Sequence, residues 1–285
     1  MTKTFCRIVL LTVLMSFPAL SQEQSSVNSP LSSAQLLDNR FTVGVAVPFH
    51  DTRDARFSST YRTAIGLRLR LEYESDDATK GITNRISANG GIAVENTAEP
   101  SFTTMQGGIL RYDHFRRFDA ISPHLFVGGY ADVGAFFATR QKFWIDDGTS
   151  LSYTLWGSLG ATAEWRQAIE LSPTLSATWR TSVSVPLVGY IIRPFFGFPY
   201  PSRFLRDGVF NFTQDGLYEQ IPASGQVQTV NGFMNAIART GLELPVSSTT
   251  RIGMEYWFQA LYAASAPRSY FQITHQITIF AGFRL

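Results

Sequence analysis

Apolar and polar side chains alternate strictly along most of the chain. The clearest segment runs from Ile65 to Glu74, where leucine, isoleucine and tyrosine side chains alternate with a glycine, two arginines and two glutamates. A period of two places successive side chains on opposite faces of a strand, and a helix cannot sort residues in this way. The segment therefore predicts a β-strand with one apolar face and one charged face.

Nine further segments show this alternation between Arg40 and the C-terminus. Each covers about 9–15 residues, enough to cross a bilayer as a tilted strand, whereas strands of soluble proteins average about 5–6 residues. The pattern predicts an all-β chain, folded as an up-and-down antiparallel transmembrane β-barrel of ten strands. The count rises to twelve if Val209–Phe212 and Gln226–Val230 also form strands.

The gaps between these segments alternate in length. With the N-terminus in the periplasm, an even number of strands returns the C-terminus to the same side. The gaps expected there are short and turn-like: Ser75–Lys80, Phe115–Ala120, Gln167–Glu170 and Pro245–Thr249. The gaps expected on the outer side include Asp51–Tyr61, Thr139–Ser150 and the long stretch 190–230. Short periplasmic turns and longer outer loops are typical of membrane β-barrels.

The N-terminus has the pattern of a secretory signal peptide. Lys3 and Arg7 precede a short apolar run, and small residues end at Ser21, which predicts a signal peptide over 1–21, a flexible polar leader over 22–39 and the barrel over 40–285. Cleavage would remove the single cysteine, Cys6, and with it any disulfide or thiolate metal site. It would also leave 22 basic and 22 acidic residues, because 24 − 2 = 22. A neutral chain gives no electrostatic reason to expect a nucleic-acid partner.

Over Arg40–Leu285 the chain resembles the bacterial outer-membrane β-barrel superfamily, through its signal peptide and its long alternating strands. In that superfamily the last strand carries an alternating assembly signal that normally ends on an aromatic residue. Here Phe283 fits the alternation, and Leu285 stands at the terminal position. The resemblance implies location in the bacterial cell outer membrane, contact with outer-membrane lipid and lipopolysaccharide, and the barrel-assembly machinery as a partner. It indicates no subfamily and no oligomeric state. The alternative fold is a secreted soluble β-sandwich or jelly roll.

If the apolar faces meet lipid, the opposite face lines the lumen with charges of both signs. The candidate lumen-lining residues are Arg68, Arg70, Glu72, Arg85, Glu95, Asp132, Glu164, Arg166, Arg180, Arg239, Glu243, Arg251 and Glu255. One interpretation is a narrow or gated, porin-like passage for transport of small polar solutes. The other is a structural or surface-interaction barrel whose lumen is closed by salt bridges, a role that suits the bidentate guanidinium of arginine.

The outward stretch 190–230 is rich in aromatic residues and proline. Loops longer than about 12–15 residues are usually functional or disordered, and the composition of this one argues against a disordered, freely solvated segment. One hypothesis is a lid over the barrel mouth, and the other is an extra hairpin packed on the rim. The lid candidates are Phe195, Phe196, Phe198, Tyr200 and Phe204.

A surface hydrolase is the least favoured function, and the sequence predicts a protein without catalytic activity. His50 and Asp51 could form half of an acid–histidine pair like that of the omptin proteases, but the paired aspartates of that family have no clear counterpart. His275 resembles the outward histidine of outer-membrane phospholipases, yet Ile277 occupies the place of their nucleophilic serine. No two histidines have metal-ligand spacing, so neither a metal nor another cofactor is indicated.

Overall fold

A computed structural model describes most of the barrel region. The described residues are 37–54, 62–95, 101–142, 149–172, 175–192, 198–200, 226–264 and 269–285. The predicted signal peptide and the leader up to residue 36 lie outside this set. Within it, no helix is both long enough and apolar enough to cross a membrane.

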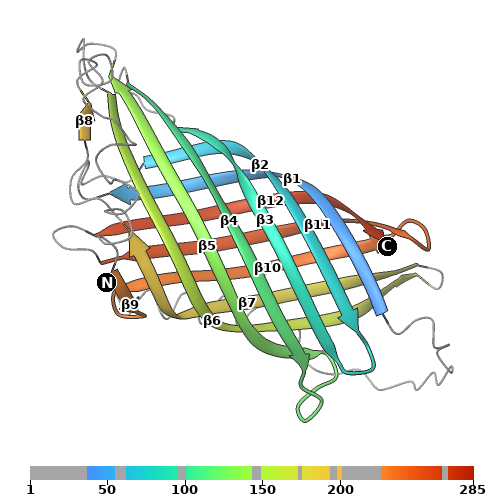
Figure 1. The fold of residues 1–285 in the computed structure, drawn as a ribbon. Coiled ribbons are helices and arrows are strands. Elements are labelled where there is room, and N and C mark those ends of the chain that lie inside the picture. Colours follow the sequence, from blue (N-terminus) through green and yellow to red (C-terminus); the bar gives the residue numbers. More distant parts are fainter. Residues whose placement is uncertain are drawn as a thin grey trace.

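Ten long antiparallel strands form a closed barrel (Figure 1). They are β1 (Leu37–Asp54), β2 (Arg62–Asp77), β3 (Ile82–Glu95), β4 (Ser101–Arg117), β5 (Leu125–Lys142), β6 (Thr149–Ser172), β7 (Leu175–Ile192), β10 (Phe233–Pro245), β11 (Thr250–Ala263) and β12 (Tyr270–Arg284). Each pairs with its neighbour in the chain, β7 with β10 and β12 with β1. The predicted ten-strand up-and-down barrel is confirmed.

Two short strands extend the barrel wall without adding to the ring. β8 (Phe198–Tyr200) pairs with the start of β6, and β9 (Gln226–Thr229) pairs with the end of β7. The predicted strand at Gln226–Val230 therefore exists, but it does not raise the number of barrel strands to twelve. Residues 209–212 lie outside the described part of the chain.

The strands are strongly tilted. Following the paired residues from Asp38 through all ten strands returns to β1 at His50, which is twelve residues further along (50 − 38). A stagger of this kind requires the strands to tilt relative to the barrel axis, and they cross the barrel obliquely in Figure 1.

Several strands are longer than the sequence predicts, and the start of β1 and the end of β6 are two examples. β1 begins at Leu37, three residues before Arg40. The turn predicted at Gln167–Glu170 is wrong, because β6 continues through it to Ser172 and pairs there with β7. Residues 167–172 keep the period of two, and only then does Pro173 follow, which lacks the backbone donor that a continuing strand needs.

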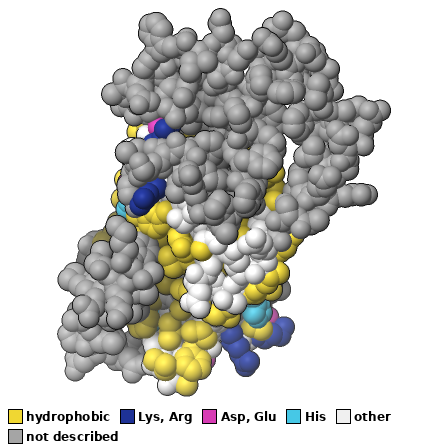
Figure 2. Space-filling model, turned by 90° about the vertical axis from the view of Figure 1, so that its left-hand side faces the viewer, with side chains coloured by type: hydrophobic (Ala, Val, Ile, Leu, Met, Phe, Trp, Pro, Cys, Tyr) yellow, Lys and Arg dark blue, Asp and Glu magenta, His cyan; other side chains and the backbone are white. Residues whose placement is uncertain are grey.

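Apolar side chains point outward and charged ones inward. On β2, Leu67 and Leu69 are 55% and 59% exposed, whereas Arg68 and Arg70 between and beside them are 6% and 4% exposed. A soluble sandwich would bury the apolar face, so this inverted pattern rules out the alternative fold and fits a lipid-facing wall. Figure 2 shows apolar side chains gathered on the described surface.

Aromatic residues mark two levels on the outer wall. Phe41 is paired directly with Tyr73 and Phe283 on the neighbouring strands, and all three are exposed. Phe49 lies on the same face of β1 nearer the outer end and is also exposed. Eight tilted strand residues between the two levels span about 20 Å, close to the apolar band of about 25 Å that aromatic girdles flank in outer-membrane barrels.

Candidate functional site: the barrel interior

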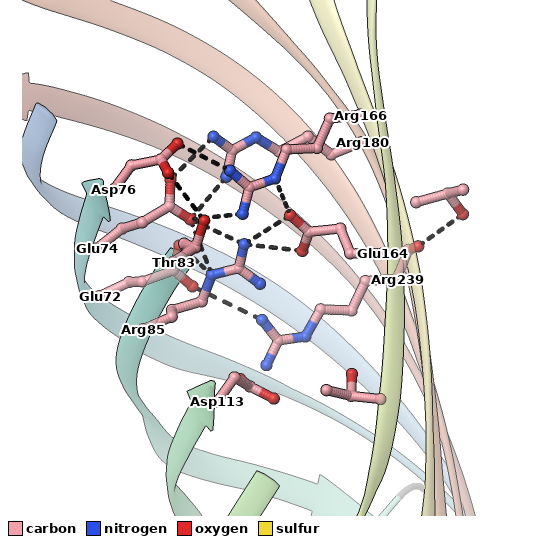
Figure 3. A network of polar contacts seen from close by, with 12 residues as sticks. Glu72, Glu74, Asp76, Thr83, Arg85, Asp113, Glu164, Arg166, Arg180 and Arg239 are labelled. Atoms are coloured by element: carbon pink, nitrogen blue, oxygen red, sulfur yellow. Dashed lines mark hydrogen bonds and ion pairs between the residues drawn. The ribbon is translucent and has the colours of Figure 1, made fainter. Parts of the chain in front are cut away.

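A network of arginines and carboxylates fills the half of the barrel nearer the start of β1, which is the end that the sequence analysis predicts to be periplasmic. Glu74 on β2 lies at the centre of this network (Figure 3). Arg180 on β7 binds Glu74 in a bidentate manner, with its two terminal nitrogens 2.8 and 2.9 Å from the carboxylate oxygens. Arg85 on β3 donates two hydrogen bonds of 3.0 and 2.8 Å to Glu74 Oε2. Arg40 and Arg166 stand further off, at 4.0 and 3.9 Å. Glu74 thus joins β1, β2, β3, β6 and β7.

Two further glutamates extend the network across the lumen. Glu164 on β6 lies 2.8 Å from Arg85 and 2.5 Å from Arg166. Glu243 on β10 lies 3.0 Å from Arg40 and 3.3 Å from Arg180, and 3.5 Å from an arginine at the periplasmic end of β11, Arg251. Each of these buried charges has partners of opposite sign on other strands, so none of them is buried alone.

A second layer of charges lies nearer the middle of the barrel. Arg70 on β2 contacts Glu255 on β11 and lies 2.6 Å from Glu72. Arg239 on β10 lies 3.6 Å from Glu72. The space among these side chains is a cavity of about 20 Å³, and a cavity of this size holds about one water molecule. The side chains that line this cavity therefore leave little room for water at this level.

Above the charged layers the interior is polar but mostly uncharged. Arg68 donates one hydrogen bond of 3.4 Å to Gln276, and within the described part of the chain no carboxylate forms an ion pair with it. Asp132 on β5 accepts hydrogen bonds from Ser158 at 2.5 Å and Asn235 at 3.1 Å. Asn235 in turn accepts one of 2.7 Å from Gln259. These contacts link strands on different sides of the lumen.

The outer half of the interior is an apolar core, which the sequence analysis missed. The largest members of this interior core are Phe136, Trp156, Phe233, Trp257 and Leu261, all buried. They stand on the inner faces of β5, β6, β10 and β11, among positions that the alternation assigned to a polar face. The sequence contains one signal for this core, because large apolar residues stand at positions that alternate with the lipid-facing ones. Which of these residues meet inside the barrel depends on how the strands pair.

Glycines on neighbouring strands leave room for these aromatic rings. An added Cβ on Gly134 would lie 2.1 Å from the ring of Trp156, and one on Gly189 would lie 2.4 Å from that of Phe233. Both distances are too short for any side chain, so the rings occupy the space beside the glycines. The packing of these two rings therefore depends on a glycine beside each of them.

All of the predicted lumen-lining residues stand on inward-facing positions, but they do not form a single site. Most belong to the charged layers, while Arg68 and Asp132 belong to the polar level above. Glu95 lies apart near the outer end, 3.3 Å from Arg62. Arg251 lies at the periplasmic end, and its side chain is 36% exposed.

The predicted lid residues are only partly within the described chain. Phe195, Phe196 and Phe204 lie outside it. Phe198 and Tyr200 belong to β8, where their backbones pair with Leu151 and Thr149 of β6. This places the backbone of β8 at the outer end of the barrel wall, and the lid stays a prediction.

The last strand closes the ring. β12 pairs with β1 along its full length, and within the assembly signal predicted at Phe283 and Leu285 the Phe283 side chain faces outward. The Leu285 amide donates a hydrogen bond of 2.9 Å to the Asn39 carbonyl. The role of these residues in assembly stays a prediction.

His50 and Asp51 do not form a pair. His50 points into the barrel and is buried, with Nδ1 2.9 Å from Thr274 Oγ1 and 3.1 Å from the Gln272 amide nitrogen. Asp51 faces the other side of β1 and accepts a hydrogen bond of 2.7 Å from Thr63. Adjacent strand residues point to opposite faces, so the acid–histidine arrangement considered from the sequence is wrong. The remaining candidate, His275, faces outward beside Tyr256.

Three solved structures illustrate how the fold compares with known proteins. The translocator domain of the autotransporter NalP from Neisseria meningitidis matches with a TM-score of 0.46 at 10% identity, over 87% of this chain and 88% of that one. The outer membrane protease OmpT from Escherichia coli matches with 0.43 at 6% identity, over 90% and 99%. An outer membrane channel from Pseudomonas putida F1 matches with 0.38 at 7% identity, over 90% and 100%. No family model and no curated protein matches the chain.

Proposed function

We propose that the chain is a bacterial outer-membrane β-barrel whose lumen is closed. The protein is then a non-conducting barrel that holds its outer loops at the cell surface for contact with other molecules. This is the structural or surface-interaction alternative of the sequence analysis. It replaces the passage for small polar solutes as the favoured function.

The filled interior is the observation that carries this proposal. The charged layers leave a cavity of about 20 Å³, and the interior core of aromatic and aliphatic side chains fills the outer half of the lumen. A hydrated ion or small solute needs a continuous path wider than a water molecule. Opening one would separate several buried ion pairs at once, and breaking a buried pair costs about 3–5 kcal/mol.

A solute passage gated by the outer loop is the rival function, and conductance separates the two. Refolded protein, shown to be folded by its heat-dependent shift in gel mobility, is inserted into planar bilayers beside a variant in which a short Gly-Ser linker replaces residues 201–225. A closed barrel is silent in both forms. Discrete steps from the intact chain overturn the proposal, and steps from the loop deletion alone establish a gated passage instead.

We infer no catalytic role for the interior. His50 is held among Gln272 and Thr274 rather than beside a carboxylate. The test is a comparison of His50→Gln with the unaltered chain in hydrolysis of fluorogenic peptides and of phospholipid vesicles. Equal background rates support the inference, and a substrate that is cleaved only by the unaltered chain contradicts it.

A further inference from the structure

The hairpin formed by β6 and β7 continues past the ladders that join these strands to β5 and β10. The ladder between β5 and β6 ends at Leu125 and Trp165, and the ladder between β7 and β10 ends at Thr178 and Glu243. The Arg166 amide still donates a hydrogen bond of 2.9 Å to the His124 carbonyl. From Gln167 on, the described residues of β6 pair only with β7, and those of β7 up to Ala177 pair only with β6. We call residues 167–172 and 175–177 the periplasmic hairpin.

The periplasmic hairpin starts where the aromatic level of the wall ends. Trp165 stacks near His124, with 5.6 Å between ring centroids, and Trp179 is paired with Gln167. Tryptophan is enriched where a barrel leaves the apolar part of the bilayer. Residues 167–172 are tilted like the rest of the wall and extend about 15 Å past that level. We infer that they lie outside the apolar part of the bilayer.

The outer face of the periplasmic hairpin is apolar although it lies outside the bilayer. Ile169 is 36% exposed, Leu171 51% and Leu175 39%. On the opposite face Glu170 is exposed, and within the described chain no cation pairs with it. Exposed apolar groups beside a free strand edge are features of a binding surface.

The edge of β6 in the periplasmic hairpin is open to another strand. Free edges are usually blunted by charged side chains, proline, bulges or shortness. Gln167–Ser172 is six residues long, contains no lysine or proline, and carries Glu170 as its one charge. Its one irregularity is a register shift close to the tip, between Glu170 and Ser172. The turns between β2 and β3 and between β10 and β11 are short and leave no comparable edge.

We propose that the β6 edge at Gln167–Leu171 binds an extended segment of a second periplasmic polypeptide by antiparallel strand addition. The bound strand continues the ladder that β5 leaves at Leu125. It carries apolar residues opposite Ile169 and Leu171 and a lysine or arginine opposite Glu170. This docking surface lies at the opposite end of the barrel from the outer loops, so it is independent of the closed lumen.

Each feature of the partner follows from the edge. Strand addition supplies the hydrogen bonds that the backbone of the β6 edge lacks. The period of two brings alternate partner side chains onto the apolar face beside Ile169 and Leu171. A basic residue on the other face neutralises Glu170, and directly opposed charges of opposite sign stabilise cross-strand pairs.

The test uses short synthetic strands as probes of the full-length barrel in detergent micelles. The first peptide is a fluorescein-labelled Val-Lys-Val-Thr-Val, which places its lysine opposite Glu170 when its valines lie on the apolar face. The second peptide carries methyl groups on alternate backbone nitrogens, which removes its ladder donors and keeps its side chains. The third replaces lysine with glutamate. Binding is measured by fluorescence polarisation.

Charge exchange identifies the edge that binds. Glu170→Lys should weaken binding of the lysine peptide at least about fivefold, because an attractive cross-strand pair becomes a repulsive one, and should restore binding of the glutamate peptide. Asp119→Lys, on the exposed β4–β5 turn, is the matched control and should leave both peptides unaffected. Each variant is first checked for the folded, heat-modifiable form.

Three outcomes would overturn the proposal. If no peptide binds saturably, the edge does not accept a strand. If the N-methylated peptide binds as tightly as the first, the backbone of β6 is not involved. If Asp119→Lys has the same effect as Glu170→Lys, binding follows the general charge of the periplasmic end rather than this edge.

Discussion

The ring of Trp156 on β6 occupies the space that a side chain on Gly134 would need. The two residues are directly paired across β5 and β6, and an added Cβ on Gly134 would lie 2.1 Å from the indole ring. Trp156 is buried in the interior core of the barrel. This pair therefore connects the composition of two strands with the filling of the lumen.

Gly134→Ala should destabilise the barrel by about 1–3 kcal/mol, the usual cost of overpacking a well-packed interior. The methyl group would displace the indole ring and the residues that pack on it. The measurement is the free energy of unfolding in urea, after refolding into lipid vesicles. Gly157→Ala is the matched control, because an added Cβ there lies 3.7 Å from its nearest neighbours. Equal effects of the two substitutions would contradict the argument.

Glu74→Gln should be among the most destabilising substitutions that change no volume. The amide leaves Arg85 and Arg180 without the carboxylate that binds both, at a cost of about 3–5 kcal/mol for a buried pair. The same unfolding measurement applies. Asp119→Asn is the control, because the pair of Asp119 with Arg117 is exposed and such pairs contribute about 0–1 kcal/mol. A loss for Glu74→Gln as small as that of the control would show that the network is dispensable.

Much of this architecture follows from the sequence, because strand faces depend on neighbours two residues apart. The alternation around Leu67 and Arg68 predicted the faces of β2 correctly, and the even number of segments predicted a closed barrel. The interior contacts depend instead on register and closure. Glu74 and Arg180 are 106 residues apart and meet only when β2 and β7 enter one ring.

The interior core could not be derived in the same way. Trp156 is an apolar residue on a polar face, and its position is explained only by Gly134, which becomes its neighbour through the pairing of β5 with β6. The length of β6 was missed for a local reason. The polar residues around Glu170 look like a turn, although the alternation continues to Ser172.

Leu69→Arg should cost about 2–4 kcal/mol in lipid vesicles, the penalty for a charge near the bilayer midplane on the lipid-facing side of a barrel. Leu69 is 59% exposed and lies between the two aromatic levels of the wall. Ile121→Arg is the control, because Ile121 is 72% exposed on the periplasmic β4–β5 turn and should tolerate the charge. A small effect at Leu69 would mean that this face is not in contact with lipid.

Removing the charge of two aspartates on the inner face should have different effects on the free energy of unfolding. Asp113 on β4 is bound by Arg111 at 2.5 Å, so Asp113→Asn leaves a buried guanidinium with a weaker partner and should destabilise the barrel by about 3 kcal/mol. Asp132 has hydrogen bonds to Ser158 and Asn235, and within the described chain its carboxylate lies in no ion pair.

Asp132→Asn removes a buried charge that no ion pair compensates, and the amide keeps an oxygen to accept from Ser158. It should leave the free energy of unfolding unchanged or raise it, because the unpaired carboxylate pays a desolvation penalty that an amide avoids. Unfolding in urea from lipid vesicles compares both variants with the unaltered chain. If Asp132→Asn were as destabilising as Asp113→Asn, the carboxylate of Asp132 would have to be stabilised as an ion, and the polar level of the interior would be part of the charged network below it.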